Sequence, residues 1–236
     1  MLIEIRCHNC NMLNKVELTE DLKTKYICSH CALESETDLC KEKYQVLFDL
    51  GIICLKNGYY KEAVSDLASS LERCFEFAIR AILAKNNFEI SKINSLWKEV
   101  INQSERQYGA FLFLFSKEFN IDFRLDQNQS GFRNDIIHKG KLPLFDSTYK
   151  YANYIYCKIC NIISILHING YTTNYIDKQY KDNNTKNGAN AYSSFIENFE
   201  LCKYDGDKHE YYIDIPDFDN LYNEFYRNNE FEVPFG

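Results

Sequence analysis

The chain has 236 residues, 45% of them hydrophobic, and a formal net charge of −7. This hydrophobic content excludes a disordered chain, and the length allows one medium domain and a small module. Three prolines and nine glycines are few for a sandwich or barrel with many turns, so the composition favours helices. The acidic excess lies in residues 169–236, so a nucleic-acid-binding surface would have to be a local patch on the middle of the chain.

The start of the chain lacks the basic residues and the apolar run of a signal peptide. The densest apolar stretch, residues 155–168, is too short and too interrupted by polar residues to span a bilayer. We therefore expect a soluble, cytoplasmic protein with no membrane partner. Ten cysteines in such a protein favour metal ligands and buried thiols over disulfides.

Two cysteine pairs near the N-terminus are candidate metal ligands: Cys7, Cys10, Cys28 and Cys31. The C-x-x-C spacing lets both thiolates of one tight turn reach a metal from the same side, and zinc prefers four tetrahedral ligands. Apolar residues before each pair indicate short strands. The pattern predicts a small β zinc ribbon over residues 1–35 with a structural Zn²⁺ and with His8 and His30 exposed. Four unrelated buried thiols, or a redox dithiol, are the alternatives.

From about residue 36, apolar residues recur at three- and four-residue steps, which indicates helices. The predicted helices cover residues 44–57, 60–84, 91–119, 132–138 and 146–168. The run Phe111–Phe115 is apolar all round, so we expect it in the middle of the bundle. Asp146 or Ser147 is expected to cap the last helix. Cys157 and Cys160 lie inside that helix, where buried thiols are favoured over a second metal site.

The segment 171–236 is acidic and rich in aromatic residues, and we expect it to form a separate C-terminal extension. A flexible loop is predicted at residues 182–188, a helix near 193–201 and a strand near 211–215. Three carboxylates of this extension either face solvent or cover a basic cleft of the helical domain: Asp214, Asp217 and Asp219.

A short polar motif precedes the last predicted helix and carries candidate catalytic groups. On a helix, Asn134 and His138 are four positions apart and share one face. Arg133 is expected in the first helical turn, where its guanidinium can hold a phosphate with two hydrogen bonds. A histidine side chain can exchange protons at neutral pH, so His138 can take a proton from a ribose 2′-hydroxyl or give one to a leaving oxygen. Lys139 and Lys141 would extend the substrate-binding patch. These groups suit metal-independent RNA cleavage that leaves a 2′,3′-cyclic phosphate.

The motif also resembles that of HEPN ribonucleases, in which an Arg is followed by a polar residue and, after four to six positions, by a His. Here Asn134 follows Arg133, and four residues separate Arg133 from His138. The flanking residues 105–112 and 133–140 are similar to those of HEPN proteins from bacterial abortive-infection systems. The resemblance covers about residues 40–170.

The resemblance implies a mainly α fold, with a HEPN-like up-and-down helical bundle over residues 36–170 joined to the small N-terminal β zinc ribbon. It implies a hydrolase that cleaves tRNA or mRNA as an antiphage (antiviral defence) or toxin–antitoxin effector. It further implies a homodimer that places two motifs across one RNA-binding cleft. An antitoxin or a phage-derived trigger would then be a further partner.

Three other interpretations remain open. In the first, Arg133 and His138 only line a surface helix that Asn134 caps. In the second, the HEPN fold has lost cleavage and binds nucleotides. In the third, the chain is a non-catalytic zinc-ribbon adaptor for a protein partner. A DNA-binding regulator is disfavoured by the near-neutral ribbon and the lack of a recognition helix rich in Arg and Lys.

Overall fold

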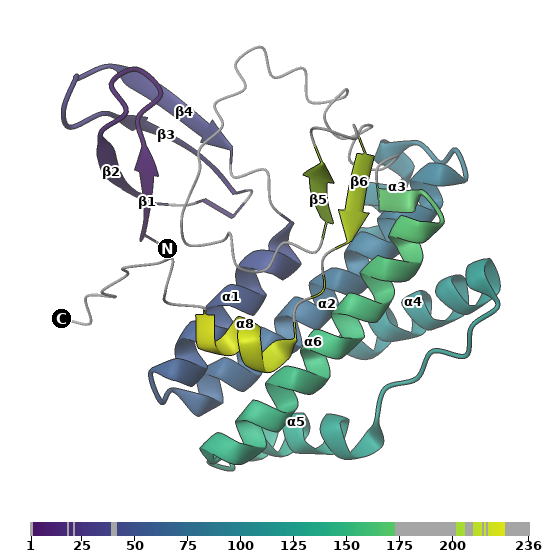
Figure 1. Cartoon of the computed structure of the whole chain (residues 1–236). Coiled ribbons are helices and arrows are strands. Elements are labelled where there is room, and N and C mark those ends of the chain that lie inside the picture. The colour runs from purple at the N-terminus through teal and green to yellow at the C-terminus, as the bar shows by residue number, and fades with distance from the viewer. Residues whose placement is uncertain are drawn as a thin grey trace.

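The protein has two β-hairpins followed by a bundle of helices, as the computed structural model in Figure 1 shows. The structure describes residues 2–17, 19–20, 22–38, 42–172, 202–205, 210–213, 215 and 217–224. The predicted mainly α fold with a small N-terminal β region is confirmed.

The N-terminal hairpins pair strands on either side of each cysteine pair. The strands are β1 (Leu2–Arg6), β2 (Leu13–Glu17), β3 (Lys23–Ile27) and β4 (Glu34–Asp38). Antiparallel pairing places Ile5 opposite Asn14 in the first hairpin and Tyr26 opposite Ser35 in the second. The predicted strands before each pair are therefore present. The second hairpin continues to Asp38, past the expected boundary at residue 35.

The helical part is built around one long central helix. Its helices are α1 (Lys43–Lys56), α2 (Tyr60–Lys85), α3 (Ile90–Lys98), α4 (Ser104–Phe119), α5 (Gln127–Lys139) and α6 (Phe145–Ile168). Helix α2 contacts α1, α3, α4, α5 and α6, so it forms the centre of the bundle. The first two helices match their predictions, and α1 ends at Asn57 before Gly58, whose φ of 81° favours glycine.

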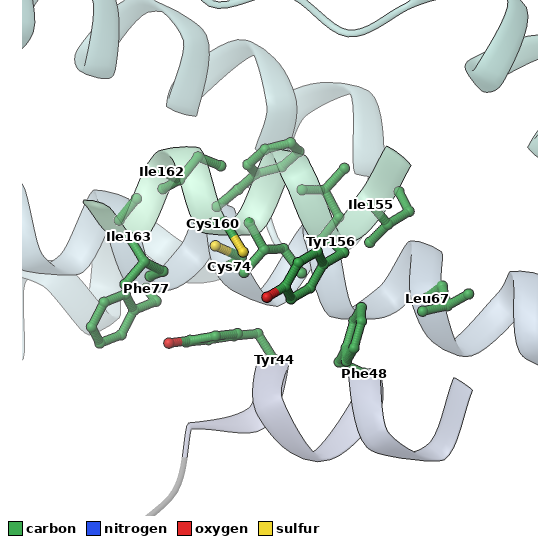
Figure 2. Close-up of a cluster of buried hydrophobic side chains, with 14 of the residues drawn as sticks. Tyr44, Phe48, Leu67, Cys74, Phe77, Ile155, Tyr156, Cys160, Ile162 and Ile163 are labelled. Carbon is green, nitrogen blue, oxygen red and sulfur yellow. The ribbon is translucent and has the colours of Figure 1, made fainter. Parts of the chain in front are cut away.

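The main core lies where α1, α2 and α6 meet (Figure 2). Aromatic side chains from α1 pack against both of the other helices. The ring centroids of Tyr44 and Phe77 on α2 are 5.6 Å apart, and those of Phe48 and Tyr156 on α6 are 5.8 Å apart. These contacts fix the three helices that carry the rest of the fold.

The predicted helix over residues 91–119 is wrong in extent, because residues 99–103 separate α3 from α4. The expectation that the run Phe111–Phe115 lies in the middle of the bundle holds for only one face of the helix. Phe111 and Phe115 are fully buried, whereas Phe113 is 79% exposed. The reason is helical periodicity, since positions four apart share the face that packs on α2 and the middle position points away from it.

The last long helix matches its prediction except at its start. Its N-cap is Leu144, and neither Asp146 nor Ser147 occupies that position. Ser147 closes the turn from within the helix, because its hydroxyl accepts the Leu144 N–H at 3.2 Å. Cys160 is buried as expected, but Cys157 is exposed, so the expectation of two buried thiols is half wrong.

Among the described C-terminal residues, helix α8 (Phe218–Glu224) packs on α6, where the ring of Phe218 lies 5.2 Å from that of Tyr149. The Tyr149 hydroxyl donates a hydrogen bond to Asp219, so this carboxylate is held at α6. Tyr149 is two positions from Tyr151, which faces α5, and two positions turn a helix by more than half a circle. Asp219 is therefore exposed but held at α6, on a side that does not cover the motif.

Strands β5 (Cys202–Asp205) and β6 (Glu210–Ile213) form an antiparallel pair, and β6 matches the strand predicted near 211–215. The predicted loop at 182–188, the predicted helix at 193–201 and Asp214 lie outside the described residues. In the part of the chain that the structure describes, none of the helices combines the length and the apolar character needed to cross a membrane.

Candidate functional site

The four N-terminal cysteines converge at the turns of the two hairpins. All four sulfur atoms lie within 4.8 Å of one another. The Sγ atoms of Cys7 and Cys31 are 3.8 Å apart, and those of Cys10 and Cys28 are 3.6 Å apart. A zinc ion at about 2.3 Å from four thiolates requires sulfur–sulfur distances of about 3.8 Å. These distances fit a tetrahedral metal site, and they are too long for a disulfide, in which the sulfurs lie about 2.05 Å apart.

Each cysteine pair sits in a tight turn of the same form. The Cys7 carbonyl accepts the N–H of Asn11, and the Cys28 carbonyl accepts the N–H of Ala32. Asn11 and Ala32 follow the second cysteine of their pairs, and both have left-handed backbone angles, with φ of 59° and 57°. The turn thereby directs both thiols of a pair toward one point and lets backbone N–H groups reach the sulfur of the first cysteine.

Hydrogen bonds to sulfur stabilise the thiolate form of Cys7 and Cys28, whereas burial and the neighbouring thiols raise the pKa of Cys10 and Cys31. The backbone N–H of Cys10 lowers the pKa of Cys7. Burial raises the pKa of Cys28, but the N–H groups of Cys31 and His30 and the Asn14 amide outweigh it and bring that pKa to about 6. The cluster is therefore suited to bind a cation.

Two buried polar side chains connect the hairpins behind the cysteines. Asn14 donates to Cys28 Sγ at 3.4 Å and accepts the Ser29 N–H at 2.8 Å. In the other hairpin, the hydroxyl of Ser35 lies 3.8 Å from Cys7 Sγ. The sequence analysis missed both residues, although each follows the first cysteine of its own hairpin by seven positions.

The Arg133 motif lies in the middle of α5, which begins at Gln127. The expectation that Arg133 occupies the first helical turn is wrong, as is the alternative that Asn134 caps the helix. Asp126 is the cap, because its carboxylate accepts the N–H groups at positions 128 and 129 at 2.7 and 3.1 Å. This cap lets the polar run 127–131 be helical and occupies the N–H groups that would have attracted a phosphate.

The three motif side chains nevertheless meet on one side of α5. Arg133 Nη1 donates to Asn134 Oδ1 at 3.0 Å and lies 3.4 Å from His138 Nε2. Arg133 Nη2 is paired with Glu72 Oε1 of α2 at 3.2 Å. Asn134 and His138 are exposed, so a ligand can reach the cluster from solvent.

Glu72 positions the guanidinium but was not indicated by the sequence. It lies 61 positions before Arg133, on another helix, and no local spacing relates the two. Burial raises the pKa of the Glu72 carboxyl, and the charge of Arg133 opposes this effect. The pair is partly buried, so it holds Arg133 at the surface of the bundle without removing it from solvent.

The two lysines after the motif are paired with the acidic residue inside it. Lys139 Nζ lies 2.8 Å from Asp135 Oδ1, and Lys141 Nζ lies 3.8 Å from Asp135 Oδ2. The Lys139 hydrogen bond lowers the pKa of Asp135. Exposed pairs of this kind are weak because solvent screens them, so either lysine can turn toward a phosphate at small cost.

A pocket of about 190 Å³ opens beside the motif, between α2, α4, α5 and α6. Arg133 and Asn134 line it from α5, and Glu72 lines it from α2. Aromatic and acidic side chains of α4 and α6 form the other walls. Two of the three motif residues thus line a concave site on the helical bundle, and His138 lies beside it through its contact with Arg133.

Comparisons with protein-family models, with curated proteins and with solved structures found no match to this chain.

Proposed function

We propose that this chain is a metal-independent endoribonuclease of HEPN type that cleaves tRNA or mRNA as an antiphage or toxin–antitoxin effector. The observation that carries the proposal is the cluster formed by Arg133, Asn134 and His138 on the exposed side of α5, at the rim of a pocket. Arg133 can bind a phosphate, and His138, 3.4 Å from it, can transfer a proton.

In the proposed reaction, Arg133 holds the scissile phosphate and Glu72 keeps the guanidinium in place. His138 takes the proton of the ribose 2′-hydroxyl, the 2′-oxygen attacks phosphorus, and the bond to the 5′-oxygen of the next nucleotide breaks. The products are a 2′,3′-cyclic phosphate and a 5′-hydroxyl, whose proton comes from the protonated imidazole of His138 in a second copy of the chain. Lys139 and Lys141 contribute to binding of the neighbouring phosphates.

A homodimer would complete the chemistry, because one imidazole is insufficient for simultaneous base and acid roles. Two copies related by a twofold axis place two motifs across one cleft. Leu142 and Leu144, which directly follow the motif, are 81% and 75% exposed and supply apolar surface for such contact. Light scattering tests this arrangement, since it predicts twice the chain mass of 27.9 kDa.

For the N-terminal hairpins we propose one structural zinc ion, bound by Cys7, Cys10, Cys28 and Cys31. Sulfur–sulfur distances near those of a tetrahedral zinc site support this assignment. All four positions would be filled by thiolates, so this metal would stabilise a module too small to fold on its core alone. We also propose three units along the chain: the zinc ribbon (residues 1–35), the helical domain (36–170) and the C-terminal extension (171–236).

The second candidate function is a non-catalytic adaptor that binds a protein partner or a nucleotide. It is favoured by the ion pairs of the site, since Glu72 engages Arg133 and Asp135 engages both lysines. In such a site the positive charges of Arg133 and the two lysines are already paired with carboxylates, which weakens the attraction for RNA.

Cleavage of a defined RNA in buffer with EDTA separates the two candidates. Arg133→Ala and His138→Ala should each reduce the rate at least about a hundredfold, the scale of a phosphate-holding or acid–base group. The matched controls are Arg124→Ala and His8→Ala, which change exposed residues of the same types outside the motif. Equal loss in a variant and its control, or no cleavage by the wild-type chain, supports the adaptor.

A further inference from the structure

The pocket beside Arg133 has rigid aromatic walls. Phe75 is buried beneath it, and Tyr108 from α4 and Tyr154 from α6 form its sides. The Tyr108 hydroxyl accepts the Leu125 N–H at 3.1 Å, and the Tyr154 hydroxyl accepts the Asp126 N–H at 2.8 Å. These bonds fix both rings against the segment that leads into α5. The pocket is therefore already formed for a planar group.

The same pocket contains two carboxylates of different availability. Glu72 is engaged through Oε1 by Arg133. Glu105, in the first turn of α4, is exposed, and its contact with the Ser104 hydroxyl is long, at 3.4 Å. Glu105 can therefore accept hydrogen bonds from a ligand without giving up a strong partner.

We infer that this pocket binds a guanine base of the RNA whose phosphate Arg133 holds, and that Glu105 selects it. A carboxylate can accept two parallel hydrogen bonds from the ring N–H and the exocyclic amine of guanine. In adenine and cytosine a ring acceptor stands beside the amine, and in uracil two carbonyls flank the N–H, so each of these repels a carboxylate. Tyrosine stacking holds any base, which leaves the choice to Glu105.

The pocket is small. Its volume of about 190 Å³ lies below the about 300–1,000 Å³ of pockets that enclose a drug-sized ligand, which restricts the ligand to a small group such as one base. Arg133 and Asn134 line the pocket and belong to the motif, so a base placed in the pocket has its sugar and phosphate beside His138. This inference rests on the proposed function only in assigning the base to a substrate RNA.

Calorimetric titration of the full-length chain with GMP, AMP, CMP and UMP tests the pocket, because none of these mononucleotides contains a phosphodiester to cleave. We expect GMP to bind at least about tenfold more tightly than the other three, as a two-bond contact to one base allows. Glu105→Gln should reduce this preference to within about twofold, because an amide presents a donor in place of one acceptor. Glu99→Gln, an exposed change of the same kind at the end of α3 and outside the pocket lining, should keep the preference.

Equal binding of the four nucleotides, or an unchanged preference in Glu105→Gln, overturns the guanine assignment even if RNA is cleaved in a His138-dependent way. Tighter binding of argininamide than of GMP also overturns it, since the pocket would then fit the guanidinium of a protein partner. Selective GMP binding by a chain that cleaves no RNA supports the pocket and contradicts the ribonuclease proposal. The two claims therefore fail separately.

Discussion

Replacing Asn14 with alanine should weaken zinc binding without removing a metal ligand. The Asn14 amide is buried and donates to Cys28 Sγ at 3.4 Å, while its carbonyl oxygen accepts the Ser29 N–H at 2.8 Å and the Ser29 hydroxyl at 3.0 Å. The amide also donates to the Met12 carbonyl at 2.9 Å. Met12 and Ser29 are exposed, so water can replace the side chain at these three groups. The sulfur is buried, so water cannot easily replace the bond to it.

The loss in the free energy of zinc binding is therefore close to that of one hydrogen bond to a charged group, about 1.5–3 kcal/mol. This corresponds to about ten- to hundredfold in zinc affinity, the scale found for groups that orient metal ligands. Competition with a chromophoric chelator at fixed pH measures the affinity. Glu17→Ala, which changes an outward-facing residue of the same strand, serves as the control and should stay within about twofold of the wild-type chain. An Asn14→Ala chain with the affinity of this control would refute the reasoning.

Three further outcomes follow from the structure. Gly51→Ala places a Cβ 2.7 Å from Leu67 Cγ where α1 crosses α2, so it should lower the free energy of unfolding by about 1–3 kcal/mol. Gly109→Ala has open space around it and should raise the free energy of unfolding by about 0.5–1 kcal/mol. A urea titration that ranks the two variants otherwise contradicts the packing. Burial, and then the charge of Glu76, raises the pKa of Glu42 to about 7 from its ordinary 4.5, so the folded state favours the protonated form. The contribution of protonated Glu42 to the free energy of unfolding is complete below about pH 4.5 and is lost as the pH rises through 7. Glu42→Gln should therefore reduce the fall in the free energy of unfolding between pH 5 and pH 7.5. An undiminished fall in this variant would show that Glu42 does not cause the fall. RNA cleavage should proceed at the same rate with EDTA and without added magnesium, and a requirement for magnesium would indicate a different active site.

Local sequence signals predicted the features of this chain that depend on neighbouring residues. The C-x-x-C spacing indicated two turns that bring four cysteines together, and helical periodicity with Asn57 and Gly58 indicated the limits of α1. The helix predicted over residues 132–138 begins five residues earlier, at Gln127, a start that was missed because Asp126 was not recognised as a cap. With that cap, a run rich in Gln, Asn and Ser continues the helix on an exposed side of the bundle.

Features that depend on tertiary contact could not be predicted in this way. Glu72 reaches Arg133 from a helix 61 positions earlier, and Tyr108 and Tyr154 meet at the pocket from α4 and α6. Asp219 binds Tyr149 across 70 positions. Such pairs are set by the packing of α2, α4, α5 and α6, and neither spacing nor propensity encodes that packing locally.

The central claim is that Arg133 and His138 cleave RNA, and end mapping of cleaved total RNA tests it most directly. Total RNA is incubated with the wild-type chain and with His138→Ala, and the new termini are identified chemically. The account predicts 2′,3′-cyclic phosphate and 5′-hydroxyl termini at defined positions with the wild-type chain and their loss with His138→Ala. Termini that appear equally with both chains, or intact RNA with the wild-type chain, would contradict it.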